Sequence, residues 1–71
     1  MHLLLNISEL AEEVRQQRQL LGMTQMELAE VAAVSLRSVK LLEAGQANPT
    51  FKQLNQLLDA LGLQLIIRRK Q

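Results

Sequence analysis

Two short helices are predicted within residues 23–45, and almost no linker separates them. The stretch reads MTQMELAEVAAVSLRSVKLLEAG. Its capping residues predict one helix over about residues 24–32 and a second over about residues 35–44. The break at Ala33-Val34 leaves room only for a tight turn, so we expect the helices to cross steeply. This pair constrains the chain to a small, mainly α fold.

Polar caps and glycines mark the ends of these helices. Thr24 followed by Glu27 forms a capping box for the first helix, and Ser35 caps the second, which Gly45 ends. Ala29 is small enough to let the two helix backbones approach each other. The expected inner faces are formed by Leu28, Ala29 and either Val31 or Ala32 in the first helix, and by Val39 and Leu42 in the second.

Further helices are predicted on either side of this pair. Asn6 caps the first of them, which Gly22 ends, and Thr50 caps the last, which Gly62 ends. Their apolar stripes are Leu10, Val14 and Leu21 in the first, and Phe51, Leu54, Leu58 and Leu61 in the last. The sequence therefore predicts a four- to five-helix domain over residues 6–62.

The final apolar segment, LQLIIRR at residues 63–69, reads as a β-strand. A strand cannot satisfy its backbone hydrogen bonds alone. It would pair with the HLLL segment near the N-terminus, with the same strand of a second copy, or with both. The expected dimer-strand residues are Leu63, Leu65, Ile66 and Ile67. Residues 1–71 are thus expected to form one domain with a C-terminal dimerisation strand.

Size and composition narrow the possible functions. A chain of 71 residues without cysteine buries about 60% of its unfolded surface, so we expect dimerisation to add stability. The sequence has no apolar run long enough for a membrane span and no signal-peptide pattern, so we expect a cytoplasmic protein. It shows no catalytic triad, glycine-rich phosphate loop or metal-ligand spacing, and His2 has no partner ligand. We expect neither enzymatic activity nor a cofactor or metal.

Charge is distributed unevenly along the chain. Residues 1–30 carry two basic and five acidic residues, a net charge of −3, whereas residues 31–71 carry six basic and two acidic residues, a net charge of +4. In the second helix of the pair, Arg37, Ser38 and Lys40 lie on the face opposite Val39 and Leu42. Such a basic face on a helix after a tight turn is typical of a DNA-reading motif, although it would also suit an ordinary solvated surface.

The stretch TQMELAEVAAVSLRSVKLLEAGQANPTFKQLNQLLDALG resembles the helix-turn-helix of Cro- and phage-repressor-type regulators, the XRE family. The resemblance covers about residues 6–62. It rests on Thr24-Gln25, Leu28-Ala29, Val34-Ser35, Ser38-Val39, Leu42-Glu43 and Gly45. Within this family, VRQQRQLLGMTQ and LDALGLQLIIRRK are similar to HipB-type antitoxins, whose C-terminal strands pair across a two-fold axis.

This resemblance implies a lambda-repressor-like domain that binds double-stranded DNA as a homodimer. It implies a sequence-specific transcriptional repressor on a near-palindromic operator, associated with the nucleoid and acting as the autorepressor and antitoxin of a toxin–antitoxin operon. The alternative is an antitoxin that acts mainly by binding a HipA-like kinase toxin. A third hypothesis is a helix-turn-helix fold kept only for protein contacts.

The resemblance also assigns roles to individual residues. The implied base-reading residues are Ser35, Leu36, Arg37 and Lys40, and the implied DNA-backbone residues are Thr24, Gln25, Ser38, Gln46, Asn48 and Lys52. Arg18 and Glu43 are implied to form a structural salt bridge. Leu36 departs from the family, which usually has a polar residue there, so it would meet a thymine methyl group or read no base. Leu41 is also unusually apolar, which suits contact with a partner rather than DNA.

Overall fold

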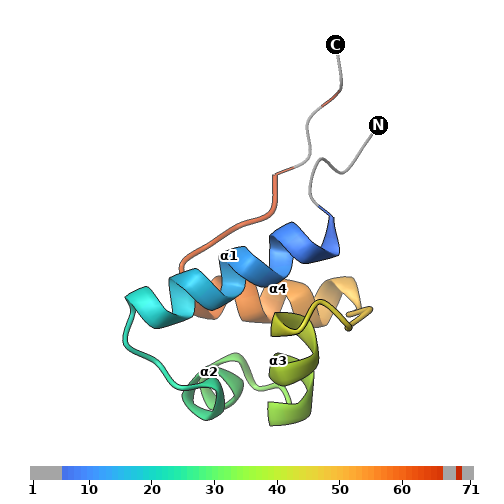
Figure 1. Ribbon diagram of the computed structural model, residues 1–71. Coiled ribbons are helices and arrows are strands. Elements are labelled where there is room, and N and C mark those ends of the chain that lie inside the picture. Colours follow the sequence, from blue (N-terminus) through green and yellow to red (C-terminus); the bar gives the residue numbers. More distant parts are fainter. Residues whose placement is uncertain (1–5, 67–68, 70–71) are drawn as a thin grey trace.

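The computed structural model describes residues 6–66 and residue 69 of the chain. Its helices are α1 (Ile7–Leu20), α2 (Gln25–Ala32), α3 (Leu36–Glu43) and α4 (Phe51–Ala60). Helix α2 packs against α3 and α4, and α1 packs against α3 (Figure 1). One end of α3 projects away from α1 and α4. The described part of the chain is all-helical, with four helices and no strand.

Side-chain caps start all four helices. Each cap accepts a hydrogen bond from the backbone N–H three residues later, and the four caps are Asn6, Thr24, Ser35 and Thr50. Full capping boxes form between Thr24 and Glu27 and between Thr50 and Gln53. These bonds satisfy N–H groups that a helix leaves unpaired in its first turn. Helices as short as α2 and α3 depend on such local bonds as well as on packing.

The core lies where the four helices meet. Its buried residues are Leu10, Val14, Leu28, Ala29, Ala32, Val39, Leu42, Leu57, Leu58 and Leu61. Two residues expected on the apolar stripes lie outside it: Leu21 is 50% exposed and Phe51 is 68% exposed. Leu21 follows the last turn of α1 and Phe51 is the first residue of α4, so both lie at helix ends. Leu57 was not among the residues expected on the apolar stripe of the last helix, but it is buried.

The inner face of α2 is completed by Ala32. Val31, the alternative from the sequence, is 64% exposed on the same helix. Both Ala29 and Ala32 are buried, so the surface that α2 presents to the core is built partly from small side chains. Small side chains allow neighbouring backbones to approach closely, which suits the packing of α2 against α3.

The turn between α2 and α3 depends on Ala33. This residue has φ 58° and ψ 41°, the left-handed conformation that residues with a Cβ adopt rarely. The N–H of Val34 donates to the backbone carbonyl of Ala29 at 3.0 Å, and the N–H of Ala33 donates to the backbone carbonyl of Glu30 at 3.2 Å. Val34 then packs, half-buried, against the core. Together these contacts reverse the chain before Ser35 caps α3.

The expected strand at residues 63–69 is absent from the described residues 63–66, which have no regular secondary structure. Leu63 and Leu65 are half-buried against the core, whereas Gln64 and Ile66 are exposed. A single chain offers this segment no strand to pair with among the described residues, and an unpaired strand is not stable. Ile67 and the HLLL segment, its expected partner, lie outside the described residues.

Candidate nucleic-acid interface

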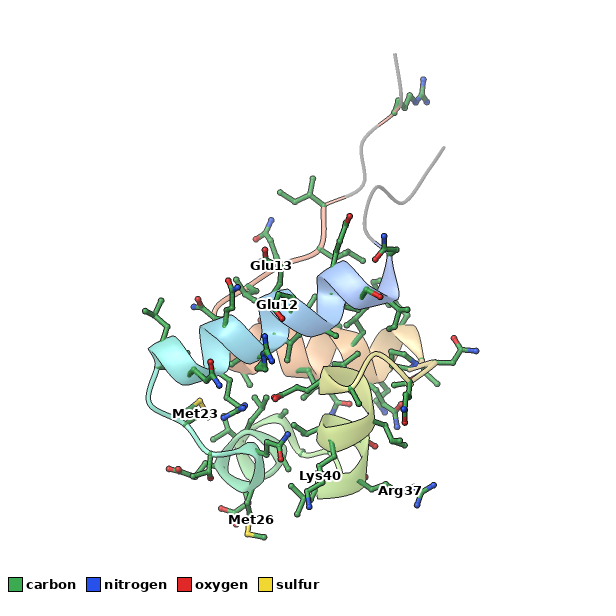
Figure 2. All side chains as sticks on the ribbon, in the orientation of Figure 1. Glu12, Glu13, Met23, Met26, Arg37 and Lys40 are labelled. Carbon is green, nitrogen blue, oxygen red and sulfur yellow. The ribbon has the colours of Figure 1, made fainter. Side chains whose placement is uncertain are left out.

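The outward face of α3 carries two basic side chains. Arg37 and Lys40 are both exposed and extend from the end of α3 that points away from α1 and α4 (Figure 2). Val39 and Leu42, on the opposite face, are at most 1% exposed. The 3.6-residue helical period separates the two faces, so burial of one presents the other to solvent. An exposed basic helix face can attract a polyanion such as DNA.

Two hydroxyl groups lie at the start of α3. Ser35 Oγ accepts a hydrogen bond from the Ser38 N–H at 3.0 Å and lies 2.8 Å from Ser38 Oγ. Ser35 is exposed and Ser38 half-buried. Leu36 is half-buried and packs against the core, so only part of its side chain is available to a ligand.

The implied DNA-backbone residues come from three places in the fold. Thr24 and Gln25 lie at the start of α2, Ser38 lies on α3, and the others, Gln46, Asn48 and Lys52, lie on the α3–α4 loop or the first turn of α4. The last three are exposed. Thr24 is exposed as well, although its hydroxyl is occupied by the capping box. The structure therefore places hydroxyl, amide and ammonium groups on α2, on α3 and beyond the end of α3.

A hollow of about 190 Å³ lies between α3, the loop that follows it and α4. Ser38, Gln46 and Asn48 contribute polar groups to its wall. The apolar part of the wall includes Leu41, Leu42, Pro49 and Leu57. Leu41, whose apolar character stood out in the sequence, is thus a half-buried side chain of this wall.

Arg18 and Glu43 form a bidentate ion pair between α1 and α3. Arg18 Nε donates to Glu43 Oε2 at 2.6 Å and Nη2 donates to Oε1 at 2.9 Å, while Nη1 donates to the Met23 carbonyl at 2.7 Å. The side chains are 11% and 5% exposed. The hydrogen bond that Arg18 donates to Glu43 raises the pKa of Arg18, so the guanidinium stays charged. Loss of one partner from a buried pair costs about 3–5 kcal/mol.

Gln25 is also connected to this ion pair. Its Nε2 donates to Glu43 Oε1 at 3.3 Å, so one carboxylate accepts hydrogen bonds from α1 and from the start of α2. Sequence reasoning missed this contact. Gln25 and Glu43 are 18 residues apart, and no periodic pattern connects them. Only the packing of α2 beside α3 brings them together.

Acidic side chains lie mainly away from the basic end of α3. Glu12 and Glu13 project from α1, on the other side of the molecule from Arg37 and Lys40 in Figure 2. The separation of acidic from basic side chains is incomplete, because Glu27 and Glu30 are exposed on α2. Glu27 is held by the capping box, where its hydrogen bond from the Thr24 backbone lowers its pKa. Arg37 and Lys40 therefore give the exposed end of α3 a local positive charge, which favours the approach of a polyanion.

A comparison with known protein families identifies the domain. A family model described as a helix-turn-helix domain matches residues 9–69, which is most of the chain. The chain belongs to the helix-turn-helix domain family. No curated protein matches it.

Family membership indicates that this helix-turn-helix protein functions in DNA-binding regulation. Helix α3, the second helix of the described pair, carries the exposed Arg37 and Lys40. Among residues 6–66, none of the helices has the length and hydropathy needed to traverse a lipid bilayer.

Proposed function

We propose that this helix-turn-helix protein is a sequence-specific transcriptional repressor that binds a near-palindromic operator as a homodimer. The observation that carries the proposal is the position of Arg37 and Lys40 on the exposed face of α3. The buried face of the same helix is fixed by Val39 and Leu42. A helix anchored on one side and basic on the other suits insertion into the DNA major groove.

Arg37 is the residue proposed to read sequence. Its guanidinium can donate two hydrogen bonds to O6 and N7 of one guanine, and such a pair discriminates against the wrong base by about 1–3 kcal/mol. Lys40 would contact a neighbouring base or phosphate. The hydroxyl and amide groups of Ser38, Gln46 and Asn48, together with Lys52, would hold the DNA backbone beside the groove. In this proposal, the residues that contact bases determine sequence specificity, and the residues that contact the DNA backbone position the protein on the duplex.

The proposed homodimer would place two recognition helices about 34 Å apart, one in each of two successive major grooves. The C-terminal segment supports it, since Ile66 is 60% exposed and residues 63–66 have no strand partner among the described residues. Pairing this segment with its copy would satisfy both backbones and bury apolar surface. The proposal assigns the protein to the cytoplasm and nucleoid and gives it no catalytic role.

Selection of bound fragments from the host genome, followed by titration at several salt concentrations, tests this function. We expect affinity to fall steeply with salt, because each phosphate contact releases counterions. Arg37→Ala should lower the preference for the selected site over random DNA by about tenfold or more. Arg15→Ala is the matched control, since Arg15 is a half-exposed cation paired with Glu12 on α1. Full operator preference in Arg37→Ala at constant salt would contradict the assigned role.

A second candidate is an antitoxin that acts mainly by binding a HipA-like kinase toxin. Exposed apolar side chains that the DNA contacts leave unused favour a protein partner, namely Leu20, Leu21, Val31 and Phe51. Co-expression with the product of the neighbouring gene tests it. A kinase-like product that co-purifies with the chain and is inhibited by it would support the antitoxin role. An isolated gene would favour the repressor alone.

A further inference from the structure

The last turn of α1 is bonded to two distant parts of the fold. Gln17 Nε2 donates a hydrogen bond to the backbone carbonyl of Leu61 at 3.0 Å, 44 residues away in the sequence. The next residue, Arg18, donates to Glu43 at the end of α3 at 2.6 and 2.9 Å. Successive residues of a helix point about 100° apart, so these two side chains leave α1 toward different neighbours. One turn of α1 thus holds the end of α3 and the end of α4.

Leu61 lies where the C-terminal segment, residues 63–66, leaves α4. It is the C-cap of that helix and is 1% exposed. A carbonyl at the end of a helix has no partner within it. Among the described residues only Gln17, which is half-buried, donates to the carbonyl of Leu61. This amide therefore fixes the orientation of the peptide plane from which the segment continues.

Backbone geometry and packing then keep the segment on a defined path. Gly62 has φ 72°, the left-handed conformation that ends many helices. The N–H of Leu63 donates to the backbone carbonyl of Leu58 at 2.8 Å, and Leu63 and Leu65 pack against the core. In Figure 1, α3 lies on one side of α1 and the segment leaves on the other. Helix α1 therefore lies between the proposed recognition helix and the segment proposed to hold a second copy.

We propose that Gln17 is a positioning residue that fixes the spacing of the two DNA half-sites. This inference rests on the proposed function. In a dimer, the distance and angle between the two α3 helices depend on how each α3 is held relative to the shared segment. The last turn of α1 makes this connection, because Arg18 holds α3 and Gln17 holds the point where the segment begins. One base pair changes the separation of two half-sites by about 3.4 Å and their relative rotation by about 35°, so a small change in this connection alters the preferred spacing.

A purely structural role for Gln17 predicts a different result. Loss of its hydrogen bond would then lower stability, and it would leave the ratio of affinities for different half-site spacings unchanged. Positioning predicts that the affinity for a single half-site is kept while this ratio falls. The ratio therefore separates the two roles.

Selection from duplexes of random sequence by the unmodified protein supplies the probes. We expect two inverted half-sites whose centres are about 10 base pairs apart. The titrated duplexes are this one, its versions with one base pair added or removed between the half-sites, and a single half-site. The variants are Gln17→Met, which favours the helix but has no N–H donor, and Gln17→Asn, whose amide is one methylene shorter. Titrations use concentrations at which sedimentation equilibrium shows dimers.

We expect the unmodified protein to bind the altered spacings about tenfold or more weakly, because binding to both half-sites at once depends on geometry. Gln17→Met and Gln17→Asn should bind the selected duplex about three- to tenfold more weakly, as for the loss of one hydrogen bond. They should discriminate between the spacings by about threefold or less, with unchanged affinity for the single half-site. Gln16→Met is the matched control, since the neighbouring Gln16 is exposed and bonds only to Glu12 on the same helix among the described residues. It should keep the full discrimination.

Full discrimination between spacings by both Gln17 variants would overturn the inference. Variants that both stay monomeric at every concentration, or that both fail to fold even at low temperature, would also overturn it, because Gln17 would then be required for assembly or folding instead. If the unmodified protein selects no paired half-sites, the proposed function itself fails. The two failures are therefore distinguishable.

Discussion

Ala33 occupies a backbone conformation that normally belongs to glycine. Its φ of 58° lies in the left-handed region, where a residue with a Cβ costs roughly 1–2 kcal/mol more than elsewhere. The turn tolerates this cost because two backbone hydrogen bonds and the packing of Val34 require the chain to reverse here. A single strained residue therefore joins the two helices of the motif.

Ala33→Gly should raise the free energy of unfolding by about 0.5–1 kcal/mol, measured by urea denaturation. Relief of the left-handed strain is partly offset by the greater freedom of glycine in the unfolded chain. Gly45→Ala provides the reverse comparison. Gly45 has φ 71° and open space where a Cβ would be, so its substitution should destabilise by about 1 kcal/mol through backbone strain alone. Destabilisation by Ala33→Gly would contradict this account of the turn.

At the scale of the element, α2 is started by a charged cap. The Glu27 carboxylate accepts the Thr24 N–H at 3.0 Å, and this backbone hydrogen bond lowers its pKa from the ordinary value of 4.5. A lowered pKa contributes stability that is present above the ordinary pKa and is lost as pH falls through the folded-state pKa. The start of α2 is thus sensitive to acid, even though its buried face is not.

We therefore expect the melting temperature to fall between about pH 5 and pH 3, and we expect Glu27→Gln to reduce that fall. Glutamine can still accept the Thr24 N–H but has no charge to lose. Glu30→Gln, a matched change at an exposed position of α2, should keep the full acid dependence, since Glu30 makes no side-chain hydrogen bond in the described structure. Identical pH profiles for the two variants would be inconsistent with a role for the charged cap.

At the scale of the whole molecule, the proposed dimer needs a surface that can hold a second copy. The core of one chain is small and made almost entirely of alanine, valine and leucine. After α4, residues 63–66 alternate between half-buried and exposed positions, as the residues of a strand with one covered face would. In the proposed dimer, the same segment of a second copy would be its backbone partner, and no such partner is found among the described residues.

Ile66→Asp should weaken the dimer at least tenfold, as measured by sedimentation equilibrium, because it places a charge in the proposed strand interface. Operator binding should weaken with it, since two half-sites would no longer be held together. Val31→Asp places the same charge at an exposed apolar position of α2 and should leave the dimer intact. A chain that is monomeric at every concentration before mutation would exclude the proposed arrangement.

Sequence reasoning was most successful where local chemistry decides structure. Hydroxyl and amide caps bond to N–H groups three residues away, so Asn6, Thr24, Ser35 and Thr50 indicate the helix starts before any tertiary contact is known. The prediction of buried residues from helical spacing failed at Leu21 and Phe51. Both fit the spacing, but they lie at helix ends and are exposed. Spacing gives the side of a helix on which a residue lies and not the length of helix that becomes buried.

The sequence by itself determined the four helices and the polar outward face of α3, because capping and helical periodicity act within a few residues. Tertiary structure alone decided that Ala33 takes a left-handed conformation, that Gln25 joins the Arg18–Glu43 ion pair, and which side chains form the hollow beside α3. These features depend on residues distant in the chain and on the angle at which helices pack. No local pattern encodes that angle, since it results from fitting all the core side chains together at once.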